Sequence, residues 1–374
     1  MNRTTITFLL SLFQLISVSS ARLLAEKKPQ NGGRTQEIIR KLRTIENGIS
    51  LGTDARIIPY ASLEDWFEPY GGFILDHGAF WNRADRMGYL FKFETLRDYS
   101  LKLRYAASTL SNEQTQVGFQ LKLKFDRDAD FYGIGNDTTE DEREPATYGS
   151  FFMGWEVTHA IGKHLALRWT PGFWTFKSGL IAGGEFERAS AANYISSRFV
   201  LSDSQTRFYW NTPVGSTWNG YVEVGIPVSS DVASYFRFNI QTHTQMPIVG
   251  KLQFHVLTRH EYVASPDRSQ VPYFALPEVG SKSDLRGYAK ERFRNYGLSL
   301  INLELPYPVI RDMAEVFLFG DFAQTTNDFS DIFDEKLHYD FGMAARLIHP
   351  LIPTAGFAIG PEGWQLFSSI AFTK

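Results

Sequence analysis

Apolar and polar residues alternate over long stretches of this chain, and no other feature constrains its fold as strongly. Between Val117 and Asp126, for example, every second residue is Val, Phe or Leu and the residues between them are Gly, Gln, Lys or Asp. Side chains of a β-strand point alternately to opposite faces, so the pattern predicts strands with one apolar face. Their length fits tilted membrane-spanning strands, which need roughly 9–11 residues.

About fifteen such segments occur between Glu68 and Phe372, whereas single-chain bacterial barrels have even strand numbers. Because an unpaired backbone edge is too costly in lipid, the sheet has to close on itself. The sequence therefore predicts an all-β fold, a transmembrane antiparallel β-barrel, with about 16 strands favoured and about 14 or 12 left open. We expect the strand missing from the pattern between Lys177 and Arg198.

The first 57 residues differ from the rest. An apolar run of about 13 residues, Ile6 to Val18, is too short for a spanning helix and precedes Ser19-Ser20-Ala21, which predicts a cleaved signal peptide over residues 1–21. Residues 22–57 read as a periplasmic linker and a short amphipathic helix from Thr35 to about Gly48. This helix could be a mobile tail, pack in or under the barrel mouth, or lie on the membrane surface. Residues 58–374 form the predicted barrel.

Composition narrows the function. The net charge of −3 over 374 residues argues against nucleic-acid binding, and 15% aromatic residues suit the girdles of a membrane barrel. The chain has no cysteine, and its eight histidines lack metal-ligand spacing. No nucleophile elbow, zinc-protease or phosphate-loop motif occurs. We therefore expect no enzyme activity, no cofactor and no metal.

The inward faces of the first strands are basic, with Lys102, Arg104, Lys122 and Lys124 in the predicted lumen. Two interpretations stand: a solvated lumen whose counter-charges come from Glu94 and Asp126, or an anion-preferring pore.

Four segments do not look like ordinary pore sequence. They are Asp130-Phe-Tyr-Gly-Ile-Gly-Asn-Asp-Thr138, the loop from Leu276 to Tyr296 with Leu285-Arg286-Gly287-Tyr288, Phe319-Gly-Asp321-Phe-Ala323, and the C-terminal stretch from Glu362 to Phe372. Together they resemble the bacterial surface antigen superfamily of outer-membrane β-barrels, the BamA/TamA-like family. Ala323, where the family usually has glycine, and the two residues after Phe372 depart from its pattern.

The resemblance implies that the loop folds back into the lumen and that Arg286 meets Asp321 on the inner wall, where Phe319 also lies. A buried arginine is costly without a carboxylate, and a bidentate pair is strong and oriented. Gly287 would allow a close approach of the backbone, and Tyr288 would pack on the wall. The family also has a weak seam between the first and last strands, which Gly71 and Gly72 at one side and Phe372 at the other would border.

Two function classes follow. The family resemblance implies an outer-membrane protein that assists insertion or translocation of polypeptides; the alternative is a small passive pore or structural barrel. Residues 22–57 cannot hold a POTRA domain, so the chain resembles a barrel-only branch and would need a periplasmic or outer-membrane assembly partner. We further expect contacts with outer-membrane lipid and lipopolysaccharide, no nucleic acid, and leave the oligomeric state open.

Overall fold

The computed structural model describes most of the chain from residue 49 onward. The described residues are 49–50, 55–64, 68–78, 86–93, 99–107, 110–112, 114–180, 191–209, 212–229, 232–281, 284–310, 314–332, 334–347 and 351–372. The predicted signal peptide and the predicted helix near residues 35–48 lie outside them. Within the described part, no helix is long and apolar enough to cross a membrane.

The described chain is nearly all strand, and its long strands follow one another along the sequence. They are β2 (Ala55–Glu64), β3 (Glu68–Gly78), β4 (Arg86–Phe93), β5 (Tyr99–Ala107), β6 (Thr115–Phe131), β7 (Glu144–Ala160), β8 (Leu165–Leu180), β9 (Ala191–Tyr209), β10 (Thr212–Pro227), β11 (Tyr235–Val249), β12 (Leu252–Ala264), β15 (Gly297–Ile310), β16 (Ala314–Thr326), β17 (His338–Leu347), β18 (Leu351–Gly360) and β19 (Gly363–Phe372).

Short elements complete the fold. The two-residue strand β1 (Ile49–Ser50) pairs with β2, and β13 (Glu278–Val279) pairs with β14 (Phe293–Arg294). Within the described ranges, 3-10 turns lie in the connections at Glu140–Glu142, Arg268–Gln270, Tyr273–Ala275 and Phe329–Asp331.

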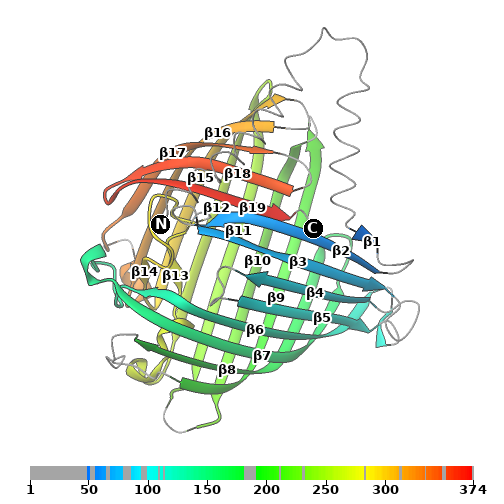
Figure 1. Ribbon diagram of the computed structural model, residues 1–374, viewed down its shortest axis with the longest axis vertical. Coiled ribbons are helices and arrows are strands. Elements are labelled where there is room, and N and C mark those ends of the chain that lie inside the picture. Colours follow the sequence, from blue (N-terminus) through cyan, green and yellow to red (C-terminus); the bar gives the residue numbers. More distant parts are fainter. Residues whose placement is uncertain are drawn as a thin grey trace, which may run out of the picture. The chain divides into compact units, whose positions relative to one another are not determined.

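The 16 long strands form one antiparallel sheet in which each strand neighbours the next in sequence. The order is cyclic, because β9 pairs with β10 and β19 stands next to β2 (Figure 1). The predicted antiparallel barrel of about 16 strands is confirmed.

The position of the missing strand was predicted wrongly. β8 pairs directly with β9, so no strand is inserted between Lys177 and Arg198; the unrecognised strand is β2. Its sequence places Ile57 and Ile58 side by side and continues with Pro59, which hides the alternation. β2 begins at Ala55, slightly before the predicted barrel boundary at residue 58.

The two faces of the wall differ as the alternation predicts. On β16, Val316 and Leu318 are 39% and 58% exposed on the outer face, while Phe317 and Asp321 are buried inside at 2% and 0%. Large outward side chains on other strands include Trp155, Trp169, Phe199, Phe236 and Phe341. An apolar exterior of this kind fits a lipid environment better than water.

Strand lengths vary around the ring. β6 to β9 have 17, 17, 16 and 19 residues, whereas β3, β4 and β5 have 11, 8 and 9, and β17 to β19 have 10 each. At about 3.3 Å per residue, the wall on either side of the β19–β2 junction is much shorter than the wall opposite.

The strands alternate in direction, so the connections after β6, β12, β16 and β18 all lie at the end opposite the beginning of β2 and the end of β19. The connection from β12 to β15, residues 265–296, is the longest of these and is called the lumen loop below. Its buried Val271, Ala275, Leu276 and Tyr296 share a hydrophobic core with inward side chains of β8, β9, β11 and β12. The lumen loop thus packs inside this end of the barrel.

Candidate functional site: the lumen loop and its wall partners

The lumen loop closes on itself through a short hairpin. β13 and β14 pair at its base, and the Glu291 amide donates to the Gly280 carbonyl oxygen at 2.7 Å. Gly280 has a φ of +115°, and a Cβ there would stand 2.4 Å from the Ala289 carbonyl oxygen. Only glycine fits such a position, so this residue fixes the turn that aims the following segment at the wall.

Arg286 at the tip of this hairpin forms a bidentate ion pair with Asp321 on β16. Its Nε and Nη2 donate to Oδ2 and Oδ1 of Asp321 at 2.8 and 2.7 Å, and its backbone amide reaches Oδ2 at 3.2 Å. A third nitrogen, Nη1, donates to Glu304 Oε1 of β15 at 2.7 Å. The guanidinium also lies over the Phe319 ring, 3.7 Å from its centroid. The sequence-predicted residues Arg286, Asp321 and Phe319 therefore meet on the inner wall.

The residues beside Arg286 are held as tightly. The Gly287 amide donates to Asp340 Oδ2 on β17 at 2.8 Å, and a Cβ on Gly287 would stand 2.7 Å from Asp340 Cβ. Leu285 and Tyr288 are 0% and 2% exposed, in one core with Phe293 and Leu300. Each residue of the Leu285–Tyr288 motif thus has a steric or polar reason for its identity.

The surroundings of Arg286 and Tyr288 determine which of the two carries a charge. Burial alone would lower the pKa of Arg286, but the hydrogen bond and charge of Asp321 hold it above its ordinary value. Burial raises the pKa of the Tyr288 hydroxyl, which therefore stays a neutral phenol. The loop presents a fixed cation to fixed carboxylates.

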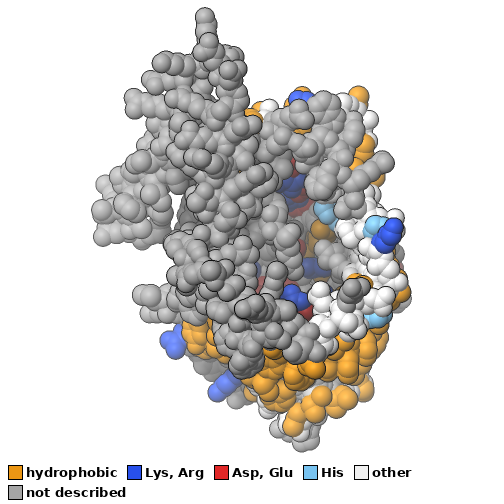
Figure 2. Space-filling model, turned by 90° about the vertical axis from the view of Figure 1, so that its right-hand side faces the viewer, with side chains coloured by type: hydrophobic (Ala, Val, Ile, Leu, Met, Phe, Trp, Pro, Cys, Tyr) orange, Lys and Arg blue, Asp and Glu red, His pale blue; other side chains and the backbone are white. Residues whose placement is uncertain are grey.

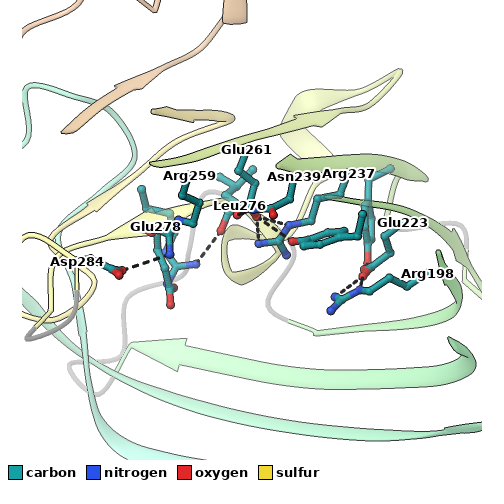
Figure 3. Close-up of polar contacts among 12 residues, drawn as sticks. Arg198, Glu223, Arg237, Asn239, Arg259, Glu261, Leu276, Glu278 and Asp284 are labelled. Carbon is teal, nitrogen blue, oxygen red and sulfur yellow. Dashed lines mark hydrogen bonds and ion pairs between the residues drawn. The ribbon is translucent and has the colours of Figure 1, made fainter. Parts of the chain in front are cut away.

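A second set of contacts anchors the opposite side of the loop to β12 (Figure 3). Arg259 Nη1 lies 3.3 Å from Asp284 Oδ2 of the loop, and its Nη2 donates to the Glu278 carbonyl oxygen. The same row of inward charges continues along the wall, where Arg237 pairs with Glu261 and Arg198 with Glu223. The loop therefore joins a chain of ion pairs on the inner face of β9 to β12.

The connection from β6 to β7 also packs on the loop; residues 132–143 are called the cap segment below. Arg292 donates from Nη1 to Thr138 Oγ1 at 3.0 Å, and the Gly135 amide donates to the Arg294 carbonyl oxygen at 2.9 Å. Asn136 accepts from both the amide and the hydroxyl of Thr325 at 3.0 Å. The segment Asp130 to Thr138, one of the four that resemble the family, thus holds the lumen loop against β16.

His338 joins the cap segment to the loop. Its Nε2 lies 2.9 Å from the Asn136 carbonyl oxygen, and its ring stacks on Phe293 with centroids 3.7 Å apart. No sequence pattern pointed to this residue, which stands alone at the first position of β17.

The loop also contacts the last hairpin of the barrel. Arg292, 1% exposed, pairs with Glu362 in the β18–β19 turn at 2.7 and 3.1 Å. With its amide nitrogen facing the loop, Gln365 of β19 donates to the carbonyl oxygens of Arg286 and Tyr288 at 3.1 and 3.0 Å. The strand beside the junction with β2 is thereby held from inside.

The seam residues need one correction. Gly71 and Gly72 lie in β3, the second strand of the ring, where they pair with Ala61 and Tyr60 of β2. They do not border the junction, because β2 precedes them in the sheet. Phe372 is the last residue of β19 and pairs with Leu351, so it lies on the strand that does border it.

The predicted basic strip lies on the inner faces of β5 and β6. Lys102 and Lys122 are direct cross-strand partners. Arg104 pairs with Glu156 of β7, and Lys124 lies 3.6 Å from Asp126. Of the two expected counter-charges, Asp126 is in place; Glu94 lies outside the described residues. Among the residues that the structure describes, no group of three or more possible metal ligands occurs.

Asp340, Glu304, Asn136 and Gln365 are wall and cap partners that sequence reasoning missed. Asp340 carried a usable signal, because it stands among His338, Gly342, Ala344 and Arg346 on the face opposite the large apolar Tyr339, Phe341 and Met343. A carboxylate at such a position is expected to face the lumen.

Comparison with known proteins places the fold. The chain matches the structure of BamA from Haemophilus ducreyi lacking POTRA domains 1–3 with a TM-score of 0.67 at 13% identity, covering 94% of this chain and 82% of that one. CdiB from Acinetobacter baumannii and CdiB from Escherichia coli match with TM-scores of 0.58 and 0.54, each at 12% identity, covering 85% and 87% of this chain.

The chain spans 60% and 62% of the length of the two CdiB chains. No protein-family model and no curated protein sequence matches it. At these identities the comparisons establish a shared barrel fold, which agrees with the family resemblance of the four sequence segments.

Proposed function

We propose that this chain is an outer-membrane barrel that assists the insertion or translocation of other polypeptides. The observation that carries the proposal is the lock, by which we mean the contacts of Arg286 with Asp321 and Glu304 and of Gly287 with Asp340 that hold the lumen loop on the inner wall. The lumen loop packs inside one end of the barrel, where it would narrow a passive pore. The shared fold with BamA and CdiB and the resemblance to the BamA/TamA-like family support the same role.

The junction between β2 and β19 is the proposed site of action. The strands around it, with 10, 8 and 10 residues in β2, β4 and β19, are at the lower limit of the roughly 9–11 residues that a tilted membrane-spanning strand needs, and a span shorter than the bilayer thins it locally. Thinned lipid next to a separable pair of strands would lower the barrier for a new strand to enter the membrane. The contacts of Arg292 and Gln365 with the last hairpin support a role of the lumen loop in opening this junction.

The proposal includes location and partners. The signal peptide of residues 1–21 would direct export, and the apolar exterior would contact lipid and lipopolysaccharide in the outer membrane. A periplasmic or outer-membrane partner would deliver substrate to the barrel. The chain would carry no catalytic activity.

A reconstituted folding assay tests this function. The purified protein would be placed in liposomes, and a second, urea-unfolded outer-membrane barrel would be added while its folding is followed on gels by heat-modifiability. We expect faster folding than in empty liposomes. Because the chain has no cysteine, a cysteine pair introduced into β2 and β19 would form only the intended disulfide, and it should abolish the acceleration until reductant is added. A rate equal to that in empty liposomes would refute the proposal.

The basic inner face of β5 and β6 favours a second candidate, an anion-preferring passive pore. Planar-bilayer recordings separate the two. A steady, anion-selective conductance that is unchanged when β2 and β19 are cross-linked supports the pore; a closed barrel, or flickering that the cross-link removes, supports the protein-handling barrel.

A further inference from the structure

Cations outnumber carboxylates on the inner wall from β5 to β9. Lys102 of β5 and Lys122 of β6 are direct cross-strand partners. Arg198 of β9 is the cross-strand partner of Glu223 on β10. We call this surface the basic wall; it consists of the cations Lys102, Arg104, Lys122, Lys124, Arg168 and Arg198, with the carboxylates Asp126 and Glu156 among them.

The carboxylates of the basic wall are shared between several cations. Glu156 pairs with Arg104 and lies 3.8 Å from Arg168, and Asp126 lies 3.6 Å from Lys124 and 3.4 Å from Lys290 of the loop. Lys122 lies directly across from Lys102, and the other charges that act on it are the cations Arg168 and Arg198 and the carboxylate Glu156. Like charges in direct cross-strand positions destabilise a sheet, so stability does not account for this arrangement.

The basic wall is open to water, unlike the lock. The side chains of Arg104, Arg168 and Arg198 are 50%, 42% and 41% exposed, whereas that of Arg286 is 6% exposed. Figure 2 shows a hollow in the molecule with Lys, Arg, Asp and Glu side chains inside it. Inward-facing side chains with this exposure border the solvent of the lumen.

The opposite wall has the reverse balance. β16 stands across the ring from β6, since the same number of strands separates them in either direction. On that side Glu304, Glu315, Asp321 and Asp340 are accompanied by the wall cation Arg346 and the loop cation Arg286. The lumen is therefore polarised, and its basic side is the one with exposed charge.

We infer that the basic wall binds acidic stretches of polypeptide inside the lumen. The inference rests on the proposed function and names the chemistry of the segment that this site takes. Its cations come from several neighbouring strands, which are about 4.8 Å apart, and from every second residue along a strand, about 6.7 Å apart. Carboxylates spaced along a chain match such a spread, and a single small anion would occupy only part of it.

The test measures binding of a fluorescent oligoglutamate peptide to the detergent-purified full chain by anisotropy, with an oligolysine peptide of equal length beside it. We expect oligoglutamate alone to bind, and to bind about tenfold more weakly to the double variant Lys102→Gln and Lys122→Gln, the effect of losing two solvent-exposed ion pairs. Lys163→Gln and Lys251→Gln, in the turns after β7 and β11, are matched controls that should leave binding unchanged.

A charge-reversal variant separates a loss of charge complementarity from a loss of fold. Lys122→Glu, checked for intact heat-modifiability, should weaken oligoglutamate binding further and improve that of oligolysine. Equal binding of both peptides by the unmodified chain, or oligoglutamate binding that the double variant retains, overturns the inference. Competition by inorganic phosphate at concentrations below that of the peptide would also overturn it, because the wall would then be a small-anion site. If the peptide binds but the chain does not accelerate barrel folding, the proposed function is wrong and the inferred peptide site remains supported.

Discussion

Asp321 and Asp340 are direct cross-strand partners on β16 and β17, and both are 0% exposed. The lumen loop supplies hydrogen-bond donors to each of them, the guanidinium of Arg286 to Asp321 and the amide of Gly287 to Asp340. Two buried carboxylates side by side are costly unless they are paired and hydrogen-bonded. The wall is thus built for the presence of the loop, and the following predictions test that dependence.

Removing the loop cation should destabilise the barrel strongly. Arg286→Ala leaves buried Asp321 without its charged partner and Glu304 with Arg346 alone, and we expect a loss of about 3–5 kcal/mol in the free energy of unfolding. Arg143→Ala is the matched control, because Arg143 is 57% exposed in its pair with Asp130 and should contribute about 1 kcal/mol or less. Urea unfolding in lipid vesicles measures both; similar losses for the two variants would contradict the lock.

Gly287 should not tolerate even a methyl group. In Gly287→Ala the new Cβ would stand 2.7 Å from Asp340 Cβ, so the loop has to move and its amide loses the hydrogen bond. We expect a cost of about 1–3 kcal/mol, typical of overpacking. Gly162→Ala has open space around its Cβ and serves as the control. Equal unfolding free energies for both variants would show that the loop does not sit against β17.

The cap segment should control how firmly the loop is held. Asn136→Ala leaves the amide and the hydroxyl of Thr325 without their acceptor and removes the Oδ1 contact of His338 Nε2, at a cost of about 1–3 kcal/mol. Amide hydrogen exchange should then rise in residues 284–296 as well as in the cap segment. Asn112→Ala, which removes a local turn contact outside the site, should leave exchange in the loop unchanged. Unaltered loop protection in Asn136→Ala would disprove the role of the cap segment.

Glu362 should govern the last hairpin. Glu362→Ala removes the carboxylate partner of buried Arg292. We expect the variant to increase the rate of amide hydrogen exchange more in β18 and β19 than in β11 and β12. Glu142→Ala, at an exposed position of the cap segment, provides a comparison. If the exchange of both strand pairs changes equally, the loop does not hold the seam selectively.

Much of this architecture was predictable from period-two alternation. The parity of Phe317, Phe319 and Asp321 places them inside, because a strand cannot turn one side chain to the other face without shifting the rest. The same rule places Lys102 and Lys122 in the lumen. β2 was not recognised as a strand because Ile57, Ile58 and Pro59 break the alternation over a short segment.

The partners of the loop could not be predicted in the same way. Parity assigns Glu304 and Asp340 to the lumen, yet which of many inward residues meets Arg286 depends on the register across β15, β16 and β17. The contacts of Asn136 with Thr325 and His338 join residues 189 and 202 positions apart, and no local pattern encodes them.

A double-mutant cycle on Arg286 and Asp321 tests the central claim most directly. The free energy of unfolding would be measured for Arg286→Ala, Asp321→Ala and the double variant, with the charge swap Arg286→Asp and Asp321→Arg as a rescue. The lock predicts that the double variant loses less than the sum of the single losses, with an interaction free energy of about 2–3 kcal/mol, and that the swap recovers part of the stability. Losses that add to within about 0.5 kcal/mol, with no rescue, would contradict it.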